Sequence, residues 1–422
     1  MKSMNKSLWA LLAAFALLAA ACGSSVADTV TDAADGAADA AGDAADAVTG
    51  DDEEAMEDDE EAMEDDEEAM EDEEEAVDAE PAAAASSLPG EGISVTMARA
   101  DWASGYIQAE LYRQVLVELG YDVSDPADLE LGPQLAYQQM SEGEIDFWTN
   151  SWYPGHLTWW EQETTDGGVT GDNLLAVEGL FSDSGVQGWL VTKSWADENN
   201  ITTLDQINDT PELAAALPDT DGDGVGEVFT CQESWTCDDI QANQFEFAGW
   251  DNIQPLKAGY DAMFAQFADL VAAGEPAIIY TWTPASYVTQ TIPGVDVLWL
   301  SVEADSVLDD SNPLGLEGGE QHTQAAAPFT GFTADTCTIG PDGCNLGWEA
   351  ADIQVTTNLT FAEENPNLIA MFETMRPSVV DISIAQVEQT AGDGSQEDVV
   401  RIVTEYIANN RDLVDSWIAV AS

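Results

Sequence analysis

The chain has 422 residues, of which 83 are acidic and 9 are basic, so its formal net charge at pH 7 is −74. A surface of this sign repels nucleic acid and anionic lipid headgroups, which excludes both as partners held by charge. The acidic residues are spread along the whole chain. We therefore interpret them as an adaptation to a salty habitat, with attraction of cationic solutes as the alternative.

The N-terminus is typical of an export signal. Lys2 and Lys6 precede an apolar run, Leu8 to Ala21, that is too short to span a bilayer comfortably. The run LLAAAC then resembles a bacterial lipobox, in which cleavage leaves Cys22 as a lipid-bearing N-terminus. We predict a lipoprotein signal peptide over residues 1–21 and a lipid anchor on Cys22. The alternative is an ordinary secretory signal with an incidental cysteine.

An acidic low-complexity linker is predicted over residues 22–88. The block DDEEAME recurs from Asp51, Asp58 and Asp65, and each block offers only Ala-Met as apolar surface. Its four acids repel one another, so the segment cannot bury enough apolar surface to order itself. We predict a disordered, extended spacer, with cation binding along it as the alternative.

The sequence after the linker predicts helices alternating with strands. The first helix shows apolar residues at Ile107, Leu111, Val115 and Leu119, which is helical spacing, and Gly120 closes it. Further helices are predicted at 133–142, 203–209, 260–274, 365–375 and 397–420. Runs typical of strands lie at 92–100, 145–147, 186–194, 277–282, 295–302 and 353–358. The alternation indicates an α/β protein built on largely parallel sheets and long enough for two lobes. No second apolar run is long enough to cross a membrane.

Four cysteines follow the linker, and disulfides persist in exported proteins. Their close spacing predicts two local bridges, Cys231–Cys237 and Cys337–Cys344, although other pairings are possible. Spacings of five and six intervening residues do not match a zinc ribbon.

Three of the 14 tryptophans stand beside turn-forming residues at strand ends or in loops: Trp152, Trp235 and Trp282. In open α/β sheets ligands bind beyond the carboxyl ends of strands, so these indoles could form the walls of a box, with core packing as the alternative for each. Indole faces attract a quaternary ammonium, which has no N–H to donate. A small disulfide ring around Trp235 would hold that indole in one orientation before a ligand arrives.

One of the two histidines, His156, follows Pro154-Gly155 at a predicted strand end. We predict that it donates a hydrogen bond to a carboxylate. A surface or core position without such a role is the alternative.

The chain resembles the ProX type of periplasmic glycine betaine/proline betaine binding proteins, which serve ABC importers. The resemblance runs from Pro89 to the C-terminus and is carried, in order, by LPGEGISV, DFWTNSWYPGH, DTDGDGVGEVFTCQESWTC and IIYTWTP. It implies an α/β, two-lobed periplasmic-binding-protein fold of the venus-flytrap kind. Matching motifs imply that the three tryptophans form the cation box. They also imply that His156 and the backbone N–H groups of Thr236 and Cys237 bind the ligand carboxylate.

The chain departs from the family pattern at two places. Thr236 stands where glycine is usual, which keeps the backbone donor but leaves the loop geometry open. The stretch TADTCTIGPDGCNLG, which contains Cys337 and Cys344, has no counterpart in the pattern.

Lobe 1 is predicted over residues 92–184 together with 302–422, and lobe 2 over 185–301. Trp152 and His156 would then come from lobe 1, and the other two tryptophans from lobe 2. Closure around a ligand would complete the box.

The segment DTDGDGVGE resembles the start of an EF-hand loop. Asp219, Asp221 and Asp223 take positions 1, 3 and 5, but Thr230 stands where the bidentate glutamate belongs. We expect a polar surface turn and no cofactor, with calcium as the alternative.

These features predict an extracytoplasmic, lipid-anchored substrate-binding protein of an ABC importer. Its partners would be a permease and a small quaternary-ammonium solute, glycine betaine or proline betaine. Alternatives are a choline or carnitine binder, a surface protein that works through its acidic segment, and an exported hydrolase. The last is disfavoured because GxSxG, HExxH and phosphate-loop motifs do not occur.

Overall fold

The computed structural model describes residues 88–165, 167–308 and 332–422. The predicted signal peptide, Cys22 and nearly all of the predicted linker lie outside these residues. Within the described ranges, every helix is too short or too polar to cross a bilayer.

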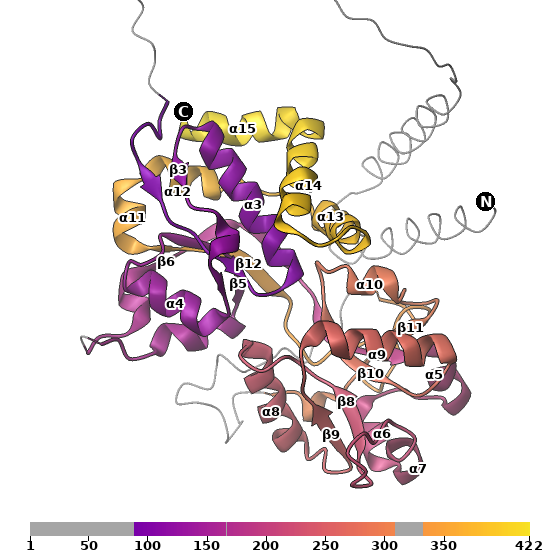
Figure 1. Ribbon diagram of the computed structural model, residues 1–422. Coiled ribbons are helices and arrows are strands. Elements are labelled where there is room, and N and C mark those ends of the chain that lie inside the picture. Colours follow the sequence, from indigo (N-terminus) through magenta and orange to yellow (C-terminus); the bar gives the residue numbers. More distant parts are fainter. Residues whose placement is uncertain (1–87, 166, 309–331) are drawn as a thin grey trace, which may run out of the picture. The chain divides into compact units, whose positions relative to one another are not determined.

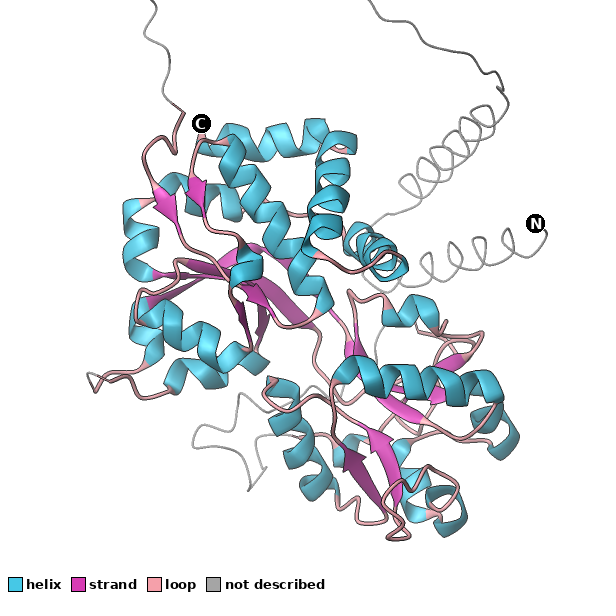
Figure 2. Cartoon of the chain, viewed as in Figure 1, coloured by secondary structure: helices cyan, strands magenta, loops and turns pink. Residues whose placement is uncertain are grey.

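The strands form two larger sheets and two short pairs (Figure 2). They are β1 Ser94–Val95, β2 Arg99–Ala100, β3 Asp122–Val123, β4 Glu130–Leu131, β5 Phe147–Tyr153, β6 Leu174–Gly185, β7 Gln187–Thr192, β8 Gly226–Phe229, β9 Ile253–Leu256, β10 Ile278–Trp282, β11 Val297–Leu300 and β12 Ala351–Asn358. The five-stranded sheet has the order β11-β7-β10-β8-β9, and the three-stranded sheet has the order β5-β12-β6. The pairs are β1 with β3 and β2 with β4.

Helices surround both sheets (Figure 1). The α-helices are α3 Ala103–Glu118, α4 Pro133–Ser141, α5 Lys193–Asn199, α6 Leu204–Asp209, α7 Pro211–Ala214, α8 Thr236–Ala248, α9 Tyr260–Ala273, α10 Tyr287–Gln290, α11 Leu359–Glu364, α12 Pro366–Phe372, α13 Val379–Ala391, α14 Gln396–Asn409 and α15 Arg411–Ala421. Short 3-10 helices are η1 Pro126–Asp128, η2 Gly155–Glu161, η3 Thr170–Asn173 and η4 Ala304–Ser306. We call β1–β6 and β12, with α3, α4, α11–α15 and η1–η3, the first half. The second half comprises β7–β11 with α5–α10 and η4.

The predicted α/β class is confirmed, but the prediction of largely parallel sheets is wrong. Both pairings of the three-stranded sheet are antiparallel, and β7 runs antiparallel to β10 and β11. Only Val186 separates β6 from β7, so the chain passes from one sheet to the other without the helical crossover that joins parallel strands.

The long C-terminal helix predicted over 397–420 is two helices. The chain leaves helical geometry at Asn410, where φ is −115° and ψ is 34°. The side-chain amide of Asn410 donates to the carbonyl of Tyr406 at 2.9 Å and so satisfies a carbonyl at the end of α14. An asparagine that competes for backbone bonds in this way favours helix ends over helix interiors.

The core of the first half is built on aromatic contacts behind β5. Phe372 of α12 is fully buried, and its ring centroid lies 5.1 Å from that of Phe147 and 5.2 Å from that of Tyr112. These contacts tie α12, α3 and β5 together and so hold the strand that carries Trp152.

Truncating Phe372 should be costly. Phe372→Ala leaves a cavity among packed rings, and we expect it to lower the free energy of unfolding by about 3–5 kcal/mol in denaturant titrations. The control is Val117→Ala on the exposed side of α3, where the side chain is 46% exposed, and we expect a change within about 0.5 kcal/mol. A similar loss in both variants would contradict the assigned packing.

Candidate functional site

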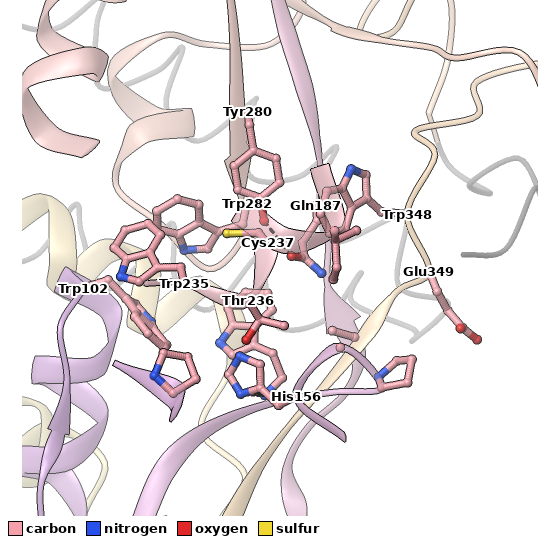
Figure 3. Close-up of a pocket in the computed structure, with 16 residues that line it drawn as sticks. Trp102, His156, Gln187, Trp235, Thr236, Cys237, Tyr280, Trp282, Trp348 and Glu349 are labelled. Carbon is pink, nitrogen blue, oxygen red and sulfur yellow. Dashed lines mark hydrogen bonds between the residues drawn. The ribbon is translucent and has the colours of Figure 1, made fainter. Parts of the chain in front are cut away.

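One pocket gathers all the predicted ligand-binding residues (Figure 3). It has an empty volume of about 570 Å³, its open mouth included, which is the size of a small-molecule site. The predicted residues that line it are Trp152, His156, Trp235, Thr236, Cys237 and Trp282. The first two come from β5 and η2 of the first half, and the others from α8 and β10 of the second half.

Trp235 and Trp282 form a corner of the pocket. Their ring centroids lie 5.4 Å apart and their planes meet at 86°, so the two indole faces are perpendicular. Tyr260 packs against both rings from behind, at 5.6 and 4.7 Å. Trp282 is the last residue of β10, so this indole does sit at the carboxyl end of a strand.

The small ring around Trp235 is closed as predicted. Cys231 and Cys237 form one disulfide, and Cys337 and Cys344 form the other, which confirms both pairings. Within the first ring, the backbone N–H of Cys231 donates to the side chain of Gln241 at 2.9 Å. Ser234 has φ of 81°, a left-handed conformation that turns the chain directly before Trp235. The ring and its hydrogen bonds therefore fix this indole before ligand binds.

Asn150 orients the indoles of the first half. Its Oδ1 accepts hydrogen bonds from Trp152 Nε1 at 2.9 Å and from Trp102 Nε1 at 3.0 Å. Its Nδ2 donates to Gln108 Oε1 at 2.6 Å, which fixes the amide. Gly185 leaves room for one of these rings, because a Cβ there would lie 2.9 Å from an atom of the Trp152 ring.

His156 is a neutral hydrogen-bond donor. Its Nδ1 accepts the backbone N–H of Trp152 at 3.1 Å and lies 3.2 Å from the hydroxyl of Tyr137, so the ring proton resides on Nε2. Burial lowers the pKa of His156 to about 3. The imidazole also packs nearly parallel to Trp148, at 5.9 Å and 18°.

The N-terminus of α8 adds backbone donors beside His156 (Figure 3). The N–H groups of Thr236 and Cys237 open the helix, where no preceding turn offers them a carbonyl. Such N–H groups and the helix dipole favour an anion. The pocket thus combines an aromatic region with a region of neutral donors, an arrangement that suits a cation and a carboxylate on one small molecule.

The sequence predictions missed four aromatic or polar residues of the lining, Trp102, Gln187, Tyr280 and Trp348. Trp102 follows β2 directly, so the same strand-end criterion would have found it. Its ring lies 5.6 Å from that of Trp235. Gln187 accepts a hydrogen bond from the Tyr280 hydroxyl at 2.6 Å.

The second disulfide lies beside the five-stranded sheet. Cys337 bridges to Trp299 of β11, and Ser301 N donates to Thr338 Oγ1 at 2.8 Å. From this ring the chain leads to Trp348, whose indole packs against Tyr280 at 5.2 Å. The predicted boundary at residue 301 assigns this segment to lobe 1, although its described contacts are with β11; the boundaries stay a prediction.

The acidic loop of the second half has the bonds of a polar turn. The carboxylates of Asp219, Asp221 and Asp223 are exposed, with oxygens within 4.8 Å of one another. Asp219 accepts the N–H groups of two glycines, and Glu227 accepts both the N–H and the hydroxyl of Thr220. The bonds fit the expected surface turn, and calcium at these aspartates stays a prediction.

Comparisons with known proteins agree on one family and one fold. A family model described as the substrate binding domain of ABC-type glycine betaine transport systems matches residues 93–409. The glycine betaine-binding periplasmic protein OusX of Dickeya dadantii is 28% identical over 339 residues, covering 80% of this chain and 92% of the relative. The glycine betaine/proline betaine-binding periplasmic protein of Salmonella typhimurium is 28% identical over 341 residues, covering 81% and 93%.

Solved structures share the fold. ProX from Borrelia burgdorferi is 11% identical with a TM-score of 0.55, covering 78% of this chain and 100% of that chain. Lactococcal OpuAC, closed and complexed with glycine betaine, is 14% identical with a TM-score of 0.51, covering 77% and 99%. These likenesses confirm the predicted periplasmic-binding-protein fold.

Acid should destabilise the protein through His156. An unfolded histidine titrates at 6.5 and the folded one at about 3, so only the unfolded state takes up the proton between these values. This contribution to stability is complete above pH 6.5 and is lost as the pH falls towards 3. Between pH 7 and 5, we expect His156→Gln to lose about 2 kcal/mol less unfolding free energy than the wild type.

Denaturant titrations at the two pH values measure this difference. His322→Gln removes the other histidine and is the control, which should follow the wild type. Equal pH dependence in wild type and His156→Gln would show that His156 is not buried in neutral form.

Proposed function

Because this chain belongs to the family of substrate-binding domains of ABC-type glycine betaine transport systems, we propose that it binds a quaternary-ammonium compatible solute and delivers it to an ABC permease. Glycine betaine and proline betaine are the ligands that suit the pocket best. One observation carries this proposal: three indoles, a neutral histidine and a helix N-terminus converge on a single pocket.

The aromatic region suits the cationic end of such a ligand. A trimethylammonium group has a dispersed charge and no N–H, so buried hydrogen-bond acceptors offer it little. Indole faces attract it through their quadrupole, worth about 2 kcal/mol or more when the group is desolvated. The perpendicular faces of Trp235 and Trp282 give two walls, and Trp152 from the first half gives a third.

The donor region suits a carboxylate. His156 Nε2–H and the N–H groups of Thr236 and Cys237 are uncharged donors, so they are buried without the cost of an unpaired cation. This set ranks choline below the betaines, because choline has no carboxylate to accept these bonds. Carnitine has both groups, but they are farther apart.

The remaining parts of the proposal concern the setting. The curated relatives are named as periplasmic proteins, which supports an extracytoplasmic location for this chain. A lipid on Cys22 would tether it outside the membrane, with the acidic segment as the spacer. The two predicted lobes would close on the ligand, and the protein would act as a binding protein, without catalysis and without a cofactor.

Calorimetric titration with glycine betaine, proline betaine, carnitine and choline tests the proposal. We expect the betaines to bind most tightly, and Trp235→Ala to weaken the best ligand by at least about thirtyfold, because a desolvated cation–aromatic contact is lost. Trp195 on α5 is buried to a similar extent, 6% exposed against 7%, and Trp195→Ala is the control that should keep the affinity. Affinity within about threefold of wild type in Trp235→Ala would count against the box.

A deletion separates this proposal from a surface protein that works through its acidic segment. Removal of residues 26–87 should leave the dissociation constant within about twofold, because every lining residue lies beyond the deletion. Loss of solute binding together with the segment would contradict the importer proposal. Turnover of choline esters would instead indicate the hydrolase.

A further inference from the structure

The first half holds the dipeptide Trp235-Thr236 from two sides. Trp235 Nε1 donates to Asp101 Oδ1 at 2.8 Å, and Trp159 Nε1 donates to Thr236 Oγ1 at 2.7 Å. Asp101 directly follows β2, and Trp159 lies in η2 after β5, whereas the dipeptide opens α8 in the second half. Two indole hydrogen bonds therefore cross between the halves, and they end on consecutive residues.

We propose that Asp101 and Trp159 are positioning residues of the ligand site, whose bonds lock Trp235 and Thr236 in place when the two halves come together. The inference rests on the proposed function. It adds that the indole wall and the α8 donors are held by the opposite half, and not only by the disulfide ring around them.

Asp101 supplies the stronger of the two bonds. Hydrogen bonds to an ionised acceptor are shorter and stronger than those between neutral groups. The carboxylate is partly buried, which raises its pKa, while the bond from Trp235 opposes that rise. The carboxylate also faces Glu130 of β4, a like charge that raises the pKa further. A carboxylate on the indole N–H makes the ring more electron-rich, which favours a cation on its face.

Thr236 supplies the acceptor of the other bond. Its side chain is 3% exposed, and glycine at this position would offer no oxygen to Trp159. The neighbouring tryptophan shows the contrast, because Trp160 Nε1 donates to the Tyr153 hydroxyl at 3.1 Å within the first half. The hydroxyl at 236 thus gives this chain a link between the halves in addition to its backbone donor.

Both bonds break when the halves separate, so they oppose opening more than they assist encounter. Their loss should appear mainly in the rate of ligand dissociation.

The first pair of variants tests Asp101. We expect Asp101→Ala to weaken betaine affinity about tenfold or more, chiefly by faster dissociation, and Asp101→Asn, which keeps an acceptor oxygen, to stay within about threefold. Glu130→Gln removes the neighbouring carboxylate without touching Trp235 and is the control. Stopped-flow tryptophan fluorescence measures the rates, and thermal unfolding without ligand reports whether each variant folds.

The second set tests the link at Thr236. Thr236→Val keeps the shape and the backbone N–H but removes the acceptor, and Thr236→Ser restores an acceptor. We expect Thr236→Val and Trp159→Phe to speed dissociation about threefold or more, and Thr236→Ser to resemble wild type. Trp160→Phe is the matched control. Because Thr236→Val and Trp159→Phe remove the same bond, the double variant should be no weaker than either single one.

The outcomes separate this inference from the proposed function. If wild type binds none of the four solutes, the proposed function fails. If wild type binds but Asp101→Ala and Thr236→Val both bind within about threefold of it, the positioning role fails. Failure of Asp101→Asn to rescue, while folded, would assign the effect to charge and also overturn the role.

A readout that needs no assumption about the ligand is the ¹⁵N-indole NMR spectrum, recorded with and without solute. Trp235→Phe and Trp159→Phe assign the two Nε1–H resonances. Asp101→Ala should shift the first resonance and Thr236→Val the second. If neither resonance responds under any condition, the two bonds are not formed and the proposal is overturned.

Discussion

The site depends on one constraint, the ring that the Cys231–Cys237 disulfide closes at the start of α8. The same few residues set the direction of the Trp235 face and aim the first N–H groups of the helix. An aromatic wall and an anion site therefore come from one covalently restrained turn, and their spacing cannot drift independently. Fixing it before binding reduces the ordering that a ligand must impose.

The donors of the pocket are polar but uncharged, and burial explains why. A protonated histidine as deeply buried as His156 would need a permanent counter-charge. With Nδ1 occupied by the N–H of Trp152, the neutral ring presents Nε2–H at no such cost. Asn150 plays the comparable part for two indoles, because one amide oxygen satisfies both N–H groups.

Sequence patterns predicted those parts of the site that lie next to strong local signals. Strand ends and cysteine spacing led to Trp282 and to both disulfides. Trp348 could not be found this way, because only contacts with Tyr280 and β11, far apart in sequence, bring it to the pocket. Strand direction was also beyond local patterns, since alternation of strands and helices fits parallel and antiparallel neighbours alike. The break at Asn410 depends on one side-chain bond, which helical periodicity does not reveal.

The single residue between β6 and β7 places the ligand close to a fulcrum. Gly185 and Gln187 flank Val186, and they lie against the Trp152 ring and the pocket lining, respectively. If the halves rotate about this crossing, atoms at the ligand travel a short arc while outlying helices travel a long one. A small solute gripped near the pivot could then be reported as a large displacement at the rim, where a transporter would sense it by leverage.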